Sequence, residues 1–506
     1  MASVSLIDGA SPMTADAIVV ATVSTGTGVA LADGAAGVDA ALDGALLPAL
    51  RAVDATGRAD EVVKIPTLGR SATPLVVAAG LGPGQPGTLD PEAVRRAVGA
   101  ALRGLKSAGR VVVAIGAGTD PHLVAAIAEG ALLGGYRFTK YKSTAKPNAL
   151  RRVDIAVSEP AQADARAAVR RARVIAEAVN NTRDLVNTPA NDLNPVTFAE
   201  YAREQGEAAG LTVEVLDERA LRRGRFGGIL AVGGGSHTPP RLVRLSYAPA
   251  RARGHAALVG KGITFDTGGL DLKNAGMGEM KADMAGAAAV IEATLAAARL
   301  KLPVAVTATV PMAENAVSGS SYRPSDIIML RDGRTVEIDN TDAEGRLILA
   351  DAILRACEDS PDFLIDTATL TGGQVVALGN GTSGVMGTDA FRDRVVALGS
   401  AVGESLWPMP LEPRLRTRLD SPVADIVNLP TDRSASMLIG GTFLKDFVPA
   451  GLDWAHIDIA GPAFLKSASG YNGEGGTGVI VRTILACLAD LAANAASNAA
   501  ANAAGG

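Results

Sequence analysis

Four acidic residues, Asp266, Asp283, Asp342 and Glu344, lie in glycine-rich or turn-like segments in the second half of the sequence. Asp342 and Glu344 are two residues apart, so in a near-extended segment their side chains lie on the same side. Carboxylates gathered in one pocket raise one another's pKa unless cations compensate their charge. Because four carboxylates are more than one octahedral ion needs, they predict two divalent ions that share bridging ligands.

Part of this pattern also has a structural interpretation. Thr341 and Glu344 have the spacing of a capping box, in which each side chain bonds a backbone N–H at the start of a helix. Asp342 and Asp283 could each be a carboxylate that a helix dipole favours in the first turn. Since Asp266 and Asp283 are joined by one loop, metal coordination is favoured over capping.

Three basic residues, Lys261, Lys273 and Arg346, lie beside the acidic ones. A lysine binds a metal only through its neutral nitrogen, so spacing alone does not assign Lys261 as a ligand. Lys273 and Arg346 would stabilise developing negative charge or hold an anion. A pair of metal ions can activate a water and polarise a carbonyl or phosphoryl oxygen, and hydrolysis is therefore the predicted reaction class.

The composition disfavours several other classes of protein. The chain has 506 residues, 48% of them hydrophobic, which is enough for two or three domains with ordinary cores. A net charge of −5 and an aromatic share of 3% disfavour nucleic-acid binding. The four histidines form no HExxH or similar pair, so a histidine-built zinc site is not expected.

The sequence also predicts a cytoplasmic location. No Lys or Arg precedes Arg51, so the basic region of a signal peptide is missing. No uncharged apolar run reaches the length of about 18 residues that a membrane helix needs. Cys357 and Cys487 lie in apolar helical patterns and are expected to be small buried hydrophobic residues.

Short Val-rich runs alternate with helical patterns in the first 160 residues. The runs predict buried strands and the patterns between them predict helices. This alternation is typical of an α/β fold, in which a mostly parallel or mixed sheet is covered by helices on both faces. The expected strands are 17–23, 61–65, 75–81, 110–116 and 153–157, and the expected helices are 38–53, 91–108 and 121–133.

The second half of the chain repeats this alternation. The expected strands are 256–259, 303–310, 335–338, 363–369 and 454–459, with helices over 284–298 and from Leu347 onward. In open parallel sheets, ligands collect at the carboxyl ends of the strands. The loops that follow Val259, Ile338, Thr369 and Ile459 are therefore expected to surround one pocket.

Four segments make up the expected domain organisation. They are an N-terminal α/β domain over 1–160 that resembles macro domains in pattern, a connecting helix over 161–186, a C-terminal catalytic α/β domain over 187–490 and a low-complexity tail over 491–506. Glycine-rich turns at 82–87, 116–119 and 233–236 lack the spacing of a phosphate loop. These turns are assigned no chemistry.

Two segments carry a resemblance to a known family. Val259-Gly-Lys-Gly-Ile-Thr-Phe-Asp266 and Asn340-Thr-Asp-Ala-Glu-Gly-Arg-Leu347 closely resemble the signatures of the cytosolic leucyl aminopeptidases, which are dinuclear metallo-exopeptidases. The resemblance covers about residues 185–488 and extends to Asn187-Thr-Pro189, Asp283, Thr369-Leu-Thr-Gly372 and Trp454-Ala-His-Ile-Asp-Ile-Ala-Gly461. The first domain resembles the N-terminal domain of that family only in pattern and length.

The resemblance implies a ligand set for two divalent ions, manganese or zinc. One ion would be held by Asp266, Asp342 and Glu344. The other would be held by Lys261, Asp266, Asp283 and Glu344, so that Asp266 and Glu344 bridge the two ions.

The resemblance also implies the residues that act on the substrate. Lys273 would polarise the scissile carbonyl or steady the tetrahedral intermediate, and Arg346 would hold a bicarbonate that shuttles protons. An apolar pocket for the first side chain would be lined by Met280, Thr369, Gly372 and Ala460, with Asn340 and Leu370 along the substrate backbone.

Peptides with a free N-terminus, beginning with leucine or another apolar residue, are the implied substrates, and the implied assembly is a homohexamer built as a dimer of trimers. Between Lys273 and Asp283 the loop is one residue shorter than is usual in the family, which affects the rim near Met277 and Met280.

A dinuclear metallophosphatase is an alternative, because two metals with a lysine and an arginine also suit a phosphoryl group. A non-enzymatic nucleotide- or DNA-binding protein with structural metals is a second alternative.

Overall fold

The computed structural model describes residues 1–11 and 13–504, of which 494–504 are described by their backbone alone. In this part of the chain, contacts between residues define two compact units. The first unit consists of Met1–Asn180 and Lys466–Glu474, and the second of Asn181–Leu465 and Gly475–Gly506. Membership of Lys466–Glu474 in the first unit is not evident from the sequence, because it depends on contacts between distant residues.

Parallel strands form most of the sheet in the described part of the first unit. The strand order is β1-β7-β6-β2-β5-β4, with β3 paired to β2; the neighbours from β1 to β5 are parallel, and β4 and β3 pair antiparallel. The strands are β1 (Ser3–Asp8), β2 (Ala17–Thr25), β3 (Gly28–Leu31), β4 (Val62–Pro66), β5 (Leu75–Pro83), β6 (Arg110–Val113) and β7 (Arg152–Val157). The sequence patterns do not predict β1 or β3.

Strand β2 shows why the first sheet needs helices on both faces. Successive side chains of a strand point to opposite sides. Val19 and Ala21 belong to the core shared with α3 and α4, whereas Ile18 and Val20 belong to the core shared with α1 and α2. These helices are α1 (Ala36–Ala40), α2 (Leu46–Ala52), α3 (Pro91–Gly104) and α4 (Pro121–Gly134).

The expected single helix over 38–53 is wrong. The structure has two short helices there, α1 and α2, and between them Asp43 and Gly44 have φ angles of 55° and 74°. A right-handed helix cannot continue through residues with left-handed backbone. Apolar spacing is preserved across the turn, and for that reason the sequence pattern resembles one helix.

Helix α5 (Ala163–Asn187) spans the division between the two units. Ala165, Ala168 and Ala172, in its first half, pack into the core of the first unit. Near its end, Arg183 is almost fully buried and its Nε donates to the carbonyl of Thr477, 2.9 Å away in the second unit.

A larger mixed sheet forms the centre of the second unit as described. Its order is β17-β16-β19-β15-β10-β12-β9-β8, with β11 paired to β12. The neighbours β19, β15, β10 and β12 are parallel, and antiparallel pairing occurs toward both edges. The strands are β8 (Thr212–Leu216), β9 (Arg241–Tyr247), β10 (His255–Gly260), β11 (Gly262–Asp266), β12 (Ala305–Asn315), β15 (Phe363–Ala368), β16 (Ser383–Gly387), β17 (Leu406–Pro408) and β19 (Asp453–Asp458).

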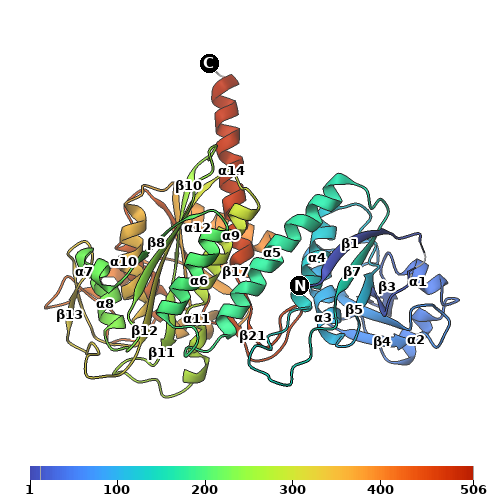
Figure 1. Cartoon of the computed structure of the whole chain (residues 1–506), viewed down its shortest axis with the longest axis horizontal. Coiled ribbons are helices and arrows are strands. Elements are labelled where there is room, and N and C mark those ends of the chain that lie inside the picture. The colour runs from blue at the N-terminus through green and yellow to red at the C-terminus, as the bar shows by residue number, and fades with distance from the viewer. Residues whose placement is uncertain (12, 505–506) are drawn as a thin grey trace. The chain divides into compact units, whose positions relative to one another are not determined.

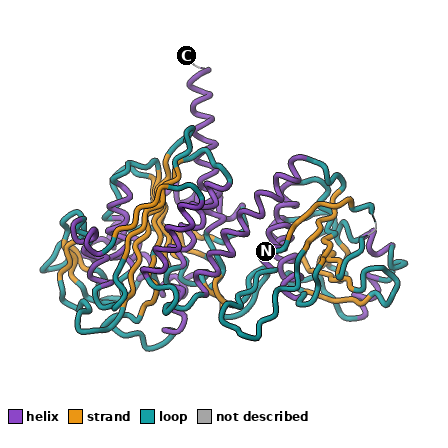
Figure 2. Tube along the Cα trace, in the orientation of Figure 1, coloured by secondary structure: helices purple, strands orange, loops and turns teal. Residues whose placement is uncertain are grey.

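Helices cover this sheet on both faces, as Figure 1 shows. One layer contains α6 (Pro195–Ala208), α9 (Ala285–Arg299), α12 (Asp389–Ala401) and α14 (Val481–Ala504). The other contains α7 (Glu218–Arg223), α8 (Gly227–Gly233), α10 (Gly345–Cys357), α11 (Gly372–Leu378) and α13 (Ser436–Lys445). Figure 2 shows the strands between the helices in both units, and the expected α/β fold is confirmed.

The strand expected at 335–338 belongs to a different sheet from the one predicted. It forms β14 (Thr335–Glu337), which pairs with β13 (Ile327–Met329) and β18 (Ile426–Val427) in a small separate sheet. The loop after Ile338 therefore reaches the site from outside the main sheet. The apolar pattern of 335–338 does not indicate which sheet this strand joins. Residues of the small sheet, including Val336, pack in the same hydrophobic core as residues of the main sheet.

Shorter elements complete the second unit. They are the 3₁₀ helices η1 (Met277–Ala282) and η2 (Pro413–Leu419) and the paired strands β20 (Phe464–Leu465) and β21 (Gly475–Gly476). The backbone of α14 remains helical to Ala504, within the expected low-complexity tail, and residues 505–506 of that tail lie outside the described residues. None of the helices that the structure describes combines the length and apolar character needed to cross a membrane.

Candidate active site

Lys261 follows β10 directly, and its side chain is 3% exposed. Glycines on both sides allow the strand to approach its neighbours closely. A Cβ on Gly260 would lie 2.6 Å from the carbonyl oxygen of Gly286, and one on Gly262 would lie 2.5 Å from that of Pro311. Because no larger residue fits at these two positions, the backbone that carries Lys261 is held tightly between α9 and β12.

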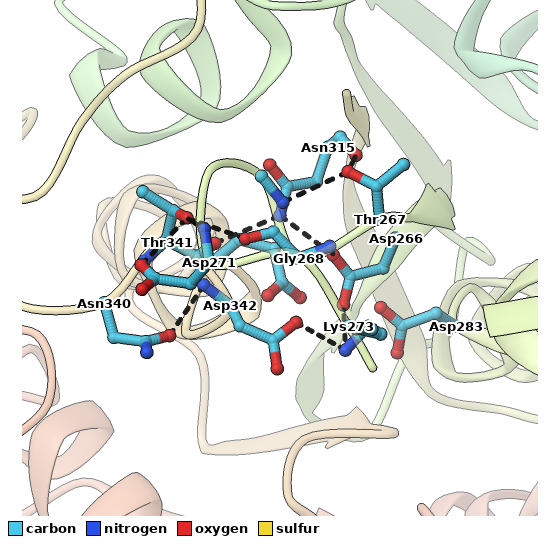
Figure 3. A network of polar contacts seen from close by, with 12 residues as sticks. Asp266, Thr267, Gly268, Asp271, Lys273, Asp283, Asn315, Asn340, Thr341 and Asp342 are labelled. Atoms are coloured by element: carbon cyan, nitrogen blue, oxygen red, sulfur yellow. Dashed lines mark hydrogen bonds and ion pairs between the residues drawn. The ribbon is translucent and has the colours of Figure 1, made fainter. Parts of the chain in front are cut away.

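The four predicted acidic residues come from three segments and meet in one place. Asp266 ends β11, Asp283 follows η1, and Asp342 and Glu344 precede α10. Three of them are buried, and the Asp342 side chain is 36% exposed. Figure 3 shows Asp266, Asp283 and Asp342 around the ammonium group of Lys273.

Two lysines hold these carboxylates together. Lys261 Nζ lies 2.8 Å from Asp283 Oδ1 and 2.8 Å from Glu344 Oε1, and it also donates to the carbonyl of Thr369 at 3.0 Å. Lys273 Nζ lies 2.7 Å from Asp266 Oδ2 and 2.5 Å from Asp342 Oδ1. Four carboxylates thus share two ammonium groups, so negative charge is in excess at this place.

The arrangement fits divalent cations. One carboxylate oxygen from each of Asp266, Asp342 and Glu344 lies within 4.8 Å of the others. Asp283 is not part of this group of three and joins the site through Lys261. Among the described residues, the buried Asp283 Oδ2 has no hydrogen-bond partner. A buried carboxylate oxygen without a donor is costly, and a cation would satisfy it.

The pKa shifts reflect the same excess of negative charge. Burial raises the pKa of Asp342 to about 6, and the charges of Asp266 and Glu344 contribute to the rise. The pKa of Asp283 is also raised, chiefly by burial and against the attraction of Lys261. Burial by itself would lower the pKa of Lys261, but the surrounding carboxylates outweigh it and the pKa rises; Lys273 behaves in the same way.

The structure excludes the capping interpretation of Thr341 and Glu344. Glu344 is the N-cap residue of α10, and no side-chain hydrogen bond caps that helix. The Thr341 hydroxyl instead donates to the carbonyl of Gly268 at 2.7 Å. Asp283 does not cap α9 either, since Met284 is the N-cap and Asp283 bonds Lys261 and Thr369.

Arg346 lies in the first turn of α10 and is 4% exposed. Its Nη1 donates to the carbonyl of Asn428 at 2.8 Å, and its guanidinium carbon lies 5.9 Å from the centre of the Phe443 ring. Its buried Nε has no hydrogen-bond partner in the part of the chain that the structure describes. Burial lowers the pKa of Arg346 to about 10, although Glu344 and Asp458 act in the opposite direction. An anion could still bind this guanidinium.

The loops after β15 and β19 carry most of the residues expected to contact substrate, and one carboxylate joins them. Asp458 Oδ1 accepts hydrogen bonds from the backbone N–H groups of Leu370 (3.1 Å) and Ala460 (3.2 Å), and Oδ2 accepts from Thr371 Oγ1 at 2.7 Å. Gly372 begins α11 directly after this contact. The loops after these two strands therefore meet, as the sequence predicts.

The other predicted substrate residues lie beside the carboxylates. Thr369 Oγ1 donates to Asp283 Oδ1 at 2.8 Å, and Asn340 Oδ1 accepts from the backbone N–H of Asp342 at 2.8 Å. Met280 is half-buried in η1, which packs against β11. The structure thus brings the predicted substrate residues to the same region of the second unit as the predicted ligands.

Sequence reasoning does not single out Asn315, Thr341 or Asp458 as functional residues. Asn315 ends β12 and Asp458 ends β19, so both stand at carboxyl ends of parallel strands. The rule that identified the other loops could have identified these two residues as well. Thr341 does not lie at the end of a parallel strand, so this rule does not identify it. Its hydroxyl bonds the carbonyl of Gly268 in a different loop.

Comparisons with known proteins agree with this geometry. Residues 180–485 match the catalytic domain of the cytosol aminopeptidase family, and residues 19–145 match the N-terminal domain of the same family. A probable cytosol aminopeptidase of Rhodococcus opacus (strain B4) is 51% identical over 479 residues, covering 93% of each chain. One from Nocardia farcinica (strain IFM 10152) is 52% identical over 454 residues, covering 88% of this chain and 89% of the relative.

Solved structures give the same result. The bottromycin maturation enzyme BotP in complex with Mn has a TM-score of 0.82 and 36% identity, covering 95% of this chain and all of BotP. A mutant of tomato leucine aminopeptidase has a TM-score of 0.86 and 30% identity, covering 97% of both chains. The chain therefore belongs to the cytosol aminopeptidase family and is a metal-dependent aminopeptidase.

Proposed function

We propose that this aminopeptidase uses two divalent ions and prefers peptides that begin with leucine or another apolar residue. Asp266, Asp342 and Glu344 would hold one ion, and Lys261, Asp266, Asp283 and Glu344 the other. The observation that carries the proposal is the cluster of four carboxylates that share only two lysines, with Asp283 Oδ2 lacking a donor among the described residues.

The types of ligand atom limit which metals suit the site. Carboxylate oxygens suit manganese, and a lysine nitrogen also suits zinc. BotP, which is similar to this chain, has a structure in complex with Mn. We propose manganese or zinc, and metal analysis of the purified protein distinguishes them. Lys261 can serve as a ligand only after it gives up the proton that the carboxylates now stabilise.

Two bound ions would supply Lewis acidity and an activated water next to the first peptide bond. The chain's own residues position the substrate. Lys273, paired here with Asp266 and Asp342, would donate a hydrogen bond to the carbonyl oxygen that gains negative charge. The backbone of Leu370 and the side chain of Asn340 would align the peptide chain.

Arg346 would hold a small anion, and bicarbonate is the one that we propose. Its buried Nε lacks a partner in the described part of the chain, and only Nη1 has a hydrogen bond to the protein. A bound bicarbonate could accept and return a proton beside the scissile bond. Bicarbonate-free buffer should therefore lower kcat, and added bicarbonate should restore it.

The apolar pocket would be formed by Thr369, Gly372 and Ala460, which follow β15 and β19, together with Met280 of η1. Asp458 fixes two of these loops to each other. A panel of aminoacyl anilides should show the highest kcat/KM for leucine and methionine. Equal turnover of aspartyl and leucyl substrates would contradict this preference.

A free N-terminus is the feature that defines an aminopeptidase substrate. N-acetylation blocks the amine that one ion would bind, so an acetylated peptide should not be cleaved at its first bond. Rapid cleavage of the acetylated peptide would refute the proposed geometry. A chromogenic phosphate ester serves as a parallel assay, and it should not be hydrolysed.

We further propose a cytoplasmic homohexamer arranged as a dimer of trimers. This proposal rests on the family to which the chain belongs and on the word cytosol in the names of its relatives. Light scattering coupled to gel filtration would give a mass about six times the chain mass of 51.2 kDa. A monomeric mass with full activity would contradict it.

A further inference from the structure

Asn315 is a fully buried residue at the end of β12, next to the carboxylates. Its side-chain amide donates from Nδ2 to Asp266 Oδ1 at 2.8 Å and to the carbonyl of Thr341 at 3.0 Å. Asp266 is the last residue of β11, and Thr341 belongs to the loop before α10. One amide group therefore joins the end of β11, at Asp266, to the loop that carries Asp342 (Figure 3).

The orientation of the Asn315 amide is determined by its neighbours. If the oxygen and nitrogen exchanged places, the oxygen would face Asp266 Oδ1 and the Thr341 carbonyl, which are both acceptors. Asn315 Oδ1 has no hydrogen-bond partner among the described residues. In this orientation Asn315 Oδ1 stays unsatisfied within the described part of the chain, but both N–H groups of Nδ2 have acceptors.

Two hydrogen-bond donors determine which oxygen of Asp266 faces the other carboxylates. Asp266 Oδ1 accepts from Asn315 Nδ2 and also from the backbone N–H of Gly268, at 2.9 Å. Both lone pairs of Oδ1 are then used within the protein. Oδ2 lies 2.7 Å from Lys273 Nζ, on the side of the other carboxylates. The carboxylate therefore cannot rotate without breaking two hydrogen bonds.

Thr341 and Asp271 form a second junction, between the loop after β11 and the loop before α10. Asp271 Oδ2 accepts from the backbone N–H of Thr341 at 2.7 Å, and Thr341 Oγ1 accepts from the backbone N–H of Asp271 at 2.9 Å. The Thr341 hydroxyl donates to the carbonyl of Gly268. Gly269 has a φ of +64°, and a Cβ there would lie 2.8 Å from Thr341 Oγ1, so the loops are in direct contact.

We propose that Asn315, Thr341 and Asp271 form a loop clamp that positions Asp266 and Asp342 for metal binding. None of the three residues is a predicted ligand, and each acts through a neighbour. Residues that orient metal ligands in this way commonly change metal affinity about 10–100-fold when they are replaced. This inference rests on the proposed function, because it needs the carboxylates to bind metal.

Substitution at Asn315 gives the sharpest test of the loop clamp. Asn315→Asp is nearly isosteric but places carboxylate oxygens against Asp266 Oδ1 and the Thr341 carbonyl. With chelator-treated protein and Mn²⁺ as the only ligand, calorimetry should show a Kd about 10–100-fold above that of the parent chain. A Kd within threefold of the parent would overturn the proposal, even if the melting temperature falls.

Thr341 provides a second test should Asn315→Asp fail to fold. Thr341→Val removes the hydroxyl and keeps the shape, whereas Thr341→Ser keeps the hydroxyl. The valine variant should bind Mn²⁺ more weakly than the parent by about tenfold, and the serine variant should bind like the parent. Equal affinities of the valine and serine variants would overturn the proposal.

Asp351→Asn is the matched control for a loss of stability alone. Asp351 is buried in the same unit, and its carboxylate accepts from the backbone N–H groups of Ile229 (3.1 Å) and Arg331 (2.9 Å), which are not predicted ligands. This variant should unfold more easily and bind Mn²⁺ like the parent. A parent chain that binds neither Mn²⁺ nor Zn²⁺ would overturn the proposed function and the loop clamp with it, whereas parent-like variants would overturn the loop clamp only.

Discussion

Buried carboxylates occur in both units, but their surroundings differ. In the first unit, Asp154 is fully buried in β7, and its two oxygens lie 2.8 Å and 2.7 Å from Arg110 and Arg152. Glu129 in the same unit pairs with Arg95 at 2.8 Å. In the described part of the second unit, four carboxylates share only Lys261 and Lys273.

The position of the carboxylates along the strands accounts for this difference. Asp154 lies within a strand, and Arg110 and Arg152 stand at paired positions of adjacent strands, so local strand register supplies its partners. Asp266 and Glu344 lie at the end of a strand and the start of a helix, where loops from distant parts of the chain converge. Two similar sheets can therefore contain a structural ion pair and a site for chemistry.

Removal of a carboxylate in each unit tests this comparison with the largest expected effect. Glu344→Gln should lower kcat/KM more than about a hundredfold, since loss of a ligand costs more than loss of a residue that orients one. Asp342→Ala should have the same effect while the protein stays folded. Aminoacyl anilide hydrolysis and circular dichroism provide the two measurements.

Asp154→Asn is the counterpart in the first unit. It should keep full activity and lose about 1–2 kcal/mol of unfolding free energy, because Arg110 and Arg152 lose a charged acceptor. Denaturant unfolding measures this loss. If Glu344→Gln retains most of its turnover, the excess negative charge in the second unit is not needed for catalysis. The proposed difference between the carboxylates of the two units would then be wrong.

Metal removal should affect only the second unit. Mn²⁺ at about 100 times its Kd would stabilise the folded unit by about 2.7 kcal/mol, because it binds the folded carboxylates and not the unfolded chain. Hydrogen exchange after chelation should accelerate in segments 266–273 and 338–346, and segment 17–25 of the first unit should be unchanged. Equal acceleration in both units would show that the ions are not confined to this site.

The acidic side chain of Asp351 allows a pH test within the second unit. Burial raises its pKa to about 7, against the hydrogen bonds from Ile229, Arg331 and Gly228. Between about pH 4 and pH 7 the folded protein therefore binds more protons than the unfolded chain, so this residue's stabilising contribution is complete below pH 4 and is lost as pH rises through 7. Over this range the unfolding free energy of the parent should fall by about 4 kcal/mol more than that of Asp351→Asn. Parallel stability curves would contradict the raised pKa.

Two exposed apolar residues provide the smallest expected effect. Leu68 in the first unit and Val376 on α11 in the second are both 89% exposed. Replacement of either by serine should change the unfolding free energy by less than about 0.5 kcal/mol. Only Val376→Ser should change KM, by about twofold to fivefold, since α11 follows the substrate loop directly. Equal KM values for both variants would show that α11 does not lie beside the bound substrate.

Much of the architecture could be predicted from local patterns. Short apolar runs predicted β2, β5, β7, β10 and β15, because a strand buried on both faces is mostly apolar. The break between α1 and α2 was not visible, because Asp43 adopts a left-handed backbone in an otherwise helical pattern. The sheet joined by β14 was also not visible, since strand pairing depends on distant segments.

The sequence by itself determined the identity of the chemical groups, namely the carboxylates around Asn340–Leu347, the lysines after Val259 and the strands that lead to them. These depend on residue type and near spacing, which local sequence records. Only the tertiary structure decided that Thr341 bonds Gly268 and Asp271 instead of capping α10, and that Asn315 orients Asp266. Hydrogen bonds between residues 49 and 70 positions apart depend on how loops converge, and no local pattern encodes that convergence.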